Sequence, residues 1–152
     1  MRKSLKTGSL VLLTAGLLAA CSGEVQDTRP GQPVKTRQTA FKEILRSFEP
    51  MGVMLREDRY NADKFLVLAK EVISKREAPW SHFAADTNYP PTKATPAVWA
   101  QADKFEEKRQ AFFKASDALL IAAESKDKKQ AFTAYNGLHE TCKDCHQTFK
   151  VR

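Results

Sequence analysis

Apolar residues recur at intervals of three, four and seven positions along most of the chain, with polar residues between them. This spacing places apolar side chains on one face of a helix, whereas a half-buried strand would need strict alternation. Helices are predicted at about Val34–Arg56, Ala62–Arg76, Ala97–Glu124 and Lys128–Lys150. Four amphipathic helices without a strand signal indicate an all-α fold, an antiparallel four-helix bundle.

The predicted helices carry recognisable start and stop signals. Asn61 is a chemically suitable N-cap for the second helix. Thr95 is the expected cap of the third helix, with Pro96 in its first turn. Pro50 lies inside the first helix, and we expect it to kink that helix or to end its regular part near Glu49.

The connection between the second and third helices, residues 77–96, is long and rich in proline and aromatic residues. Rings such as Trp80, Phe83 and Tyr89 need a surface to cover, so this loop is predicted to lie against the helices. The inner side of the last helix is predicted to carry Phe132, Tyr135, Leu138, Cys142, Cys145, His146 and Phe149.

The first twenty residues differ from the rest of the chain. Three basic residues precede an apolar stretch at 10–20, which is too short to span a bilayer. This is the pattern of a secretory signal peptide, and we expect residues 1–20 to be removed.

The end of this leader, Leu-Ala-Ala before Cys21, resembles the bacterial lipobox, so Cys21 is the expected lipidation site. The alternative is an ordinary signal peptide with a chance cysteine. Residues 21–33 are polar and contain two prolines and two glycines, which predicts a flexible tether. The folded domain is then expected at 34–152.

Length and charge exclude several classes of protein. The 152 residues suit one domain. The formal net charge is +7, and removal of 1–20 leaves 22 basic and 18 acidic residues, a net charge of +4. The basic residues alternate with acids instead of forming a stripe, which argues against a nucleic-acid partner. Three cysteines are too few for a disulfide scaffold.

The most specific motif is Cys142-Lys143-Asp144-Cys145-His146, because C-x-x-C-H is the attachment signal for c-type haem. Two thiols at this spacing can reach the two vinyl groups of one haem, and the adjacent imidazole can point at its iron. Fourteen aromatic residues are available to line the cavity of a large planar group. We predict one covalent haem c on Cys142 and Cys145, with His146 as axial ligand.

Other uses of the motif fit less well. A thioredoxin-like redox pair needs a βαβ context, which is absent from the pattern. A metal site would lack an evident fourth ligand, and a structural disulfide is the third alternative. Export favours haem, because c-type maturation takes place outside the cytoplasm. These assignments also account for all three cysteines, since Cys21 takes the lipid and the other two take the haem.

With its haem motif near the C-terminus of a four-helix bundle, the chain resembles cytochrome c′, a class II cytochrome c. The resemblance covers about residues 33–150. It is carried by Val34–Phe41, Ala78–Phe83, Pro96–Trp99, Lys104–Phe105, Gln110–Phe112 and the haem motif.

The resemblance implies roles for individual residues. His146 would be the proximal ligand, and Arg37 and Gln38 would lie near the haem propionates. Phe41 would cover the distal face, where low-spin relatives have methionine, so the iron is expected to be five-coordinate and high-spin. Lys150 stands on the proximal side where many members have arginine, and it keeps the charge but loses the fork of donors. Alternatively, Lys150 is simply exposed near a helix C-terminus.

No other side chain is expected to fill the sixth iron position. His139 lies seven residues, roughly 10 Å, before the haem histidine on the same helix. Met51 and Met54 lie about 15 and 20 Å from Phe41 along the first helix and are better core fillers. His82, in the aromatic loop, is more simply explained as exposed or structural.

The expected function is nitric oxide binding or protection in the periplasm, with CO as a second ligand, and no enzymatic activity in the strict sense. Bound dioxygen gains much from a distal hydrogen-bond donor, which Phe41 cannot supply. The resemblance also implies that nitric oxide can end on the proximal face after displacing His146. The alternative is a one-electron carrier between periplasmic redox partners with an unknown donor. A third is a haem-free redox or metal module on the two motif cysteines.

Location and assembly follow from weaker signals. The membrane is expected to hold the protein through the lipid anchor only. Ser22 is not the aspartate that often marks inner-membrane retention, which favours the outer membrane. The resemblance implies a possible homodimer through the first two helices.

Overall fold

The structure is a computed structural model that describes residues 25–151. The leader, the predicted lipidation site Cys21 and residues 22–24 lie outside the described residues. Within 25–151 the chain forms five α-helices, one short 3-10 helix and a single isolated β-bridge. No helix in this range is both long and apolar enough to cross a membrane.

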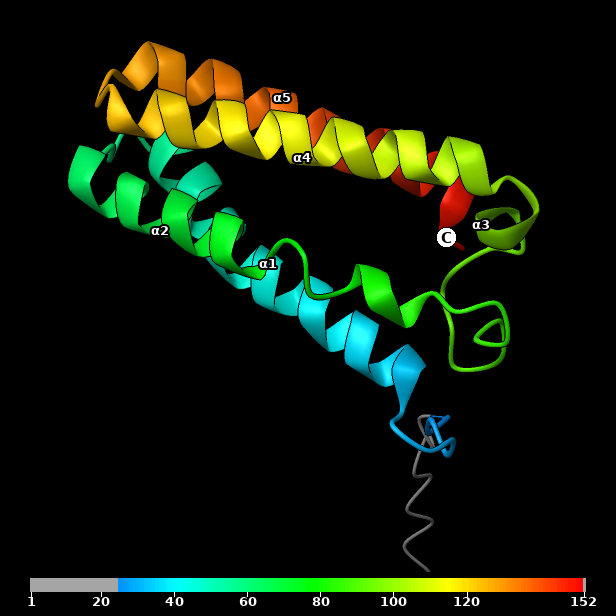
Figure 1. Cartoon of the computed structure of the whole chain (residues 1–152). Helices are drawn as coiled ribbons and strands as arrows, with labels where there is room; N and C mark the ends of the chain where they lie inside the picture. Colours follow the sequence, from blue (N-terminus) through cyan, green and yellow to red (C-terminus); the bar gives the residue numbers. More distant parts are fainter. Residues whose placement is uncertain (1–24, 152) are drawn as a thin grey trace, which may run out of the picture.

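Four long helices pack as two antiparallel pairs (Figure 1). In the first pair, α1 (Pro33–Arg56) lies beside α2 (Ala62–Lys75). In the second, α4 (Ala102–Glu124) lies beside α5 (Lys128–Phe149), and α2 packs on α4 to join the pairs. The predicted all-α four-helix bundle is confirmed.

Most predicted helix ends hold to within a residue or two. The Asn61 side chain caps α2 by accepting the Lys64 N–H at 2.9 Å, as expected. The first helix does not end near Glu49. Instead, α1 continues through Pro50 to Arg56.

The third predicted helix is divided. Gln101, with φ −127° and ψ 51°, separates a short α3 (Ala97–Ala100) from α4. The expected Thr95 cap is wrong, because the Thr95 hydroxyl donates to the Thr148 carbonyl at 2.8 Å. That contact holds the loop before α3 against the end of α5.

The core includes a close aromatic contact between the two helix pairs. Phe48 of α1 stacks on Tyr135 of α5 with ring centroids 4.4 Å apart. This contact requires Gly52, because a Cβ there would lie 2.1 Å from the Tyr135 hydroxyl oxygen. Phe132 was expected on the inner face of α5 but is 47% exposed. It follows Ala131 by one position, about 100° around the helix, and therefore leaves the buried stripe.

The segment predicted as a flexible tether is bonded to the domain from Asp27 onward. Asp27 is only 2% exposed, and its carboxylate accepts the N–H groups of Val34 and Lys35 at 2.8 and 3.1 Å. Gln32, the residue before α1, has φ 43° and supplies no side-chain cap. Asp27 therefore satisfies N–H groups that the first turn leaves free, which the sequence pattern did not reveal.

Candidate haem site

The C-x-x-C-H motif lies in the last two turns of α5. Cys142, Cys145 and His146 share one helix face, because residues three and four apart are neighbours. Both thiols are free and half-buried, and Cys142 packs against the main core. His146 was expected on the inner side of α5 but is exposed. Two free thiols and an imidazole on one face, beside apolar rings, fit a covalently held haem.

A cluster of aromatic rings from the loop and three helices lies at this end of the bundle. Trp80, from the 3-10 helix η1 (Trp80–His82), lies at the centre of the cluster. The indole N–H of Trp80 donates to the Arg76 carbonyl at 2.6 Å. Trp80 has ring centroids within 6.3 Å of Phe41, Phe83, Phe105, Phe112 and Phe113. The predicted packing of the aromatic loop against the helices is confirmed.

This cluster connects position 41 with the end of α5. Phe41 of α1 meets Trp80 edge-on at 5.4 Å and is half-buried against the same core as Cys142. Phe149, three residues after His146, meets Phe105 at 5.2 Å. The structure therefore brings the predicted distal residue and the haem motif to one apolar region.

Arg37 is 3% exposed and binds the loop after η1. Its guanidinium donates to the His82 and Thr87 carbonyls at 2.8 and 2.9 Å, and to the hydroxyls of Thr87 and Thr92. All these partners are neutral oxygens, so no carboxylate in the described chain pairs with this cation. Gln38 donates to the Pro91 carbonyl at 3.0 Å. Sequence reasoning missed this structural role, because neither residue carries a signal that names the loop as its partner.

Lys150 follows the last residue of α5 in extended conformation and is exposed. It forms the isolated β-bridge with Ala94, and the Val151 N–H donates to the Lys93 carbonyl at 2.8 Å. The loop before α3 is thus fixed to the helix end that carries His146. Partial desolvation of the His146 imidazole by its neighbours lowers its pKa, and the Lys150 charge lowers it further.

The surroundings of the thiols argue against a redox pair. Burial raises the pKa of Cys142. Burial and the neighbouring Cys142 raise the pKa of Cys145 to about 11. A catalytic thiol needs the opposite shift, towards the thiolate. Among residues 25–151, no three His, Cys, Asp or Glu side chains converge as a metal site.

The side chains discarded as sixth ligands have other places in the fold. Met51 is fully buried and Met54 is 8% exposed, both within the main core. His139 is exposed and stacks on Tyr135 at 6.3 Å. His82 is half-buried, and its carbonyl accepts from Arg37.

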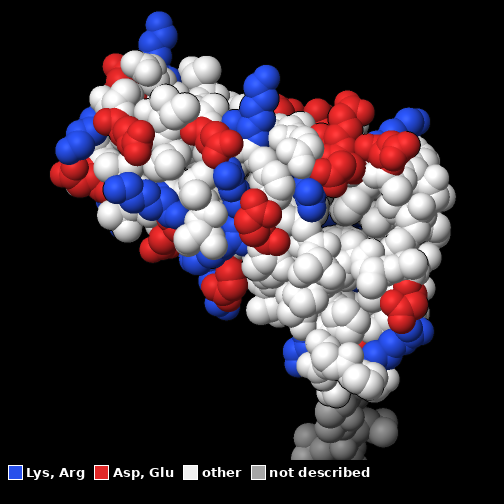
Figure 2. Space-filling model, in the orientation of Figure 1, with Lys and Arg blue, Asp and Glu red and all other residues white. Residues whose placement is uncertain are grey.

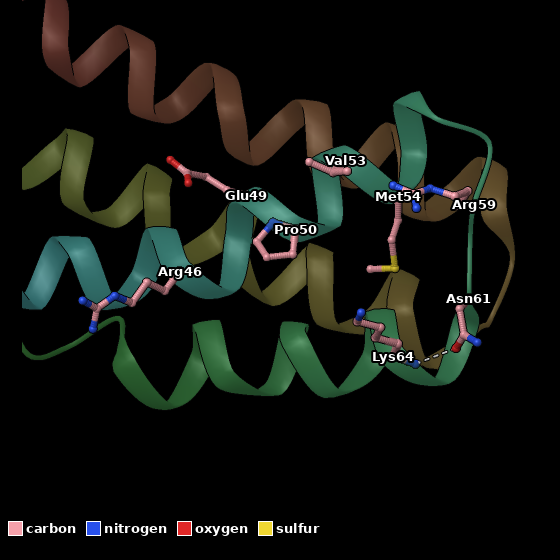
Figure 3. Close-up of a pocket in the computed structure, with 8 residues that line it drawn as sticks. All are labelled: Arg46, Glu49, Pro50, Val53, Met54, Arg59, Asn61 and Lys64. Carbon is pink, nitrogen blue, oxygen red and sulfur yellow. Dashed lines mark hydrogen bonds between the residues drawn. The ribbon is translucent and has the colours of Figure 1, made fainter.

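A hollow of about 690 Å³ lies elsewhere, between α1 and α2 (Figure 3). It includes none of the predicted haem residues and none of the aromatic cluster, so it is separate from the haem site. Its lining residues are Arg46, Glu49, Pro50, Val53, Met54, Arg59, Asn61 and Lys64.

Comparisons with known proteins agree with this site. A family described as cytochrome C′ matches residues 32–150. Cytochrome c′ of Cereibacter sphaeroides is 30% identical over 146 residues, covering 93% of this chain and 97% of the relative.

Solved structures give the same result. Cytochrome c prime from Shewanella frigidimarina has a TM-score of 0.77 at 29% identity, covering 82% of this chain and 98% of that one. A nitric oxide complex of a cytochrome c prime variant from Alcaligenes xylosoxidans has a TM-score of 0.76 at 25% identity, covering 84% and 100%. Members carry one covalent c-type haem per chain and are not enzymes in the strict sense. This chain belongs to the cytochrome c′ family, and its cofactor is haem c.

Proposed function

We propose that this protein is a periplasmic haem protein with five-coordinate, high-spin iron that binds nitric oxide and CO, in nitric oxide protection or sequestration. The observation that carries the proposal is the place of Phe41, whose phenyl ring cannot ligate iron. It packs edge-on against Trp80 beside the core that Cys142 also contacts. The nitric oxide complex of the Alcaligenes xylosoxidans relative supports the choice of ligand.

In this proposal Cys142 and Cys145 hold the haem through thioethers, and His146 is the axial iron ligand. Arg37 and Gln38 lie near the propionates. Support comes from the Arg37 guanidinium, whose hydrogen-bond acceptors are all neutral and which forms no ion pair with a carboxylate in the described chain. Lys150 contributes a second cation on the proximal side.

When bound, the haem would supply an iron that can take a small diatomic molecule as ligand. The side chains around the iron determine which gas ligands are stabilised when they bind. Phe41 offers no hydrogen bond, so dioxygen gains little, whereas nitric oxide bonds strongly without such help. Displacement of His146 by nitric oxide would move the ligand to the proximal face, beside Lys150.

The proposal includes export and anchoring. Residues 1–20 act as the signal peptide, and Cys21 carries the lipid that holds the domain, 34–152, at the outer membrane. Homodimerisation through α1 and α2 is part of the same proposal. Leu45 of α1 and Val67 of α2 are 42% and 57% exposed, and a second copy would cover them.

The test is visible absorption of the ferric and ferrous holoprotein, before and after nitric oxide is added. High-spin spectra that shift on exposure are expected. Phe41→Met is expected to add a sixth ligand and slow gas binding, while Phe132→Met, on an exposed phenylalanine, changes neither. A Cys142→Ser, Cys145→Ser double variant loses covalent haem on a denaturing gel.

The second candidate function is one-electron transfer between periplasmic partners, with an unidentified donor. The exposure of His146 favours it, because a motif near the surface shortens the path for an electron. Low-spin spectra that do not respond to nitric oxide would select this function and reject gas binding.

A further inference from the structure

The N-terminal segment is fastened to the end of the bundle that carries the haem motif. The Tyr89 hydroxyl donates to the Asp27 carboxylate at 2.8 Å, and so does the Val34 N–H. Arg29 donates to the Asp86 carbonyl at 2.7 Å and lies 3.9 Å over the Tyr89 ring. The chain is thus fixed to the fold well before α1 begins.

This fastening shortens any tether to a lipid. Asp27 lies six positions after Cys21, and an extended chain covers at most about 3.3–3.6 Å per residue. A lipid on Cys21 is therefore held within roughly 20 Å of Asp27. A tether free as far as Pro33 would reach about twice that distance.

The surface beside this segment is poor in charge. The loop face, defined as residues 78–101, has only two charged residues, Asp86 and Lys93, although 28% of the whole chain is charged. Arg29 already pairs with Asp86. Figure 2 shows a wide uncharged area on this side of the molecule. The exposed cations Lys35 and Lys93 lie at the same end, where they suit anionic headgroups. The exposed acids Asp103, Glu106 and Glu107 lie on the adjoining start of α4, outside the loop face.

The opposite end of the bundle has the character of a surface that faces water. Residues 56–64, from the end of α1 to the first turn of α2, include six charged residues in nine. Lys126 pairs across this end with Asp63 at 2.8 Å, and Lys128 pairs with Asp58. At the haem end charge is concentrated on the helices, because residues 102–109 at the start of α4 include six charged residues in eight. The loop face is therefore the part of that end that is poor in charge.

We propose that an anionic phospholipid surface covers the loop face and holds the haem end of the bundle against the membrane. This inference rests on the proposed lipid at Cys21. Uncharged diatomic gases dissolve better in hydrocarbon than in water, so the haem site would take nitric oxide from the lipid side.

The test compares thiol labelling at the two ends of the holoprotein. Asn88→Cys lies on the loop face and Glu124→Cys at the far end, and both positions are exposed. The lipidated variants are placed in vesicles of phosphatidylethanolamine and phosphatidylglycerol, and a bulky polyethylene glycol maleimide is added. Labelling of Asn88→Cys is expected to be several-fold slower than in the unlipidated Cys21→Ser form, with Glu124→Cys unchanged. Equal slowing at both positions, or at neither, overturns the proposal.

A second pair of variants tests the short tether. Asp27→Ala should restore much of the labelling at Asn88→Cys, because the chain is then free as far as α1. Thr28→Ala, at an exposed position, is the matched control and should retain the protection. Lys93→Glu should weaken protection on anionic vesicles without touching the fastened segment. Unchanged protection in both Asp27→Ala and Lys93→Glu contradicts the proposed orientation.

The experiment distinguishes a failure of the proposed lipid anchor from a failure of the proposed gas-binding site. Mass spectrometry of the purified protein reports lipid on Cys21, and its absence rejects the membrane-facing orientation. Absorption of the same samples with nitric oxide reports the haem site whatever the mass shows.

Discussion

The two ends of the bundle are built in different ways. At the end with the α1–α2 and α4–α5 turns, regular helices pack directly, and Phe65 and Leu119 are fully buried. At the haem end the loop after α2, η1 and α3 fill the space between the helices (Figure 1). The rings there are mostly half-buried, and Arg37 holds the loop through four hydrogen bonds.

This difference suggests that the turn end contributes mainly to stability and the haem end also to ligand binding. Direct helix packing at the turn end involves no residue of the haem site. The haem end is held by polar contacts between a long loop and two helix ends, which leaves an apolar surface for a planar group. Substitutions at the turn end should therefore change the free energy of unfolding, and those at the haem end should also change ligand binding.

The largest effect is expected for Phe65→Ala at the turn end. Phe65 is fully buried, and its truncation leaves a cavity that should cost about 3–5 kcal/mol of unfolding free energy. Val67→Ala, on the exposed side of the same helix, should change it by less than about 0.5 kcal/mol. Denaturant unfolding measures both. Nitric oxide binding by the folded fraction should match the unsubstituted protein, and a change there would contradict the separation.

Gly52→Ala tests the contact that joins α1 to α5 midway along the bundle. The new Cβ would meet the Tyr135 hydroxyl, and the Tyr135 ring is stacked on Phe48 and cannot move freely. Overpacking of this kind costs about 1–3 kcal/mol.

Gly137→Ala is the matched control, because a Cβ at Gly137 meets nothing within 4 Å. Its higher helix propensity should stabilise α5 by up to about 1 kcal/mol. Thermal unfolding of the two variants should therefore shift in opposite directions, and a parallel shift would show that the close approach at Gly52 is unimportant.

Arg37→Lys moves the test to the haem end. Lysine keeps the charge but cannot supply the fork of donors that holds the loop after η1. Loss of these bonds at a buried site should cost about 1–2 kcal/mol. The loosened loop carries Phe83 and follows Trp80, so nitric oxide association should also change. Lys42→Arg, exposed on the same helix, should change neither quantity.

Regular features of the sequence predicted the regular part of the molecule. The spacing of apolar residues gave the four long helices, and the Asn61 cap followed from local chemistry. The motif on α5 predicted the haem, which family membership confirms. The fixed loop could not be predicted, because Arg37 and Asp27 find partners more than 40 positions away that no local pattern encodes. Phe132 shows a second limit of sequence-based prediction, since hydrophobicity alone does not say whether a residue at the edge of an apolar helix face is buried.

Each end of the bundle has a carboxylate whose partners lower its pKa, so stability at both ends should depend on acid pH. Burial would raise the pKa of Asp27, but hydrogen bonds from Lys35, Tyr89, Arg29 and Val34 outweigh it and hold the pKa below 3.8. At the turn end, the Lys128 hydrogen bond and charge lower the pKa of Asp58. Each folded-state pKa lies below its unfolded value. Both carboxylates therefore stabilise the fold above about pH 4, and this is lost as the pH falls through the folded pKa.

Salt should distinguish the two carboxylates, and this is the smallest effect expected. The Asp58 pair is exposed, so raising the ionic strength from about 0.1 to about 1 M should screen most of it. The donors to Asp27 include backbone N–H groups and a neutral hydroxyl, whose hydrogen bonds salt screens much less. Unfolding of Asp58→Asn and Asp27→Asn between about pH 7 and pH 3 measures the difference. In high salt only Asp27→Asn should still flatten the loss of stability with acid. Equal salt sensitivity would mean that Asp27 acts as an exposed surface charge and does not fasten the chain.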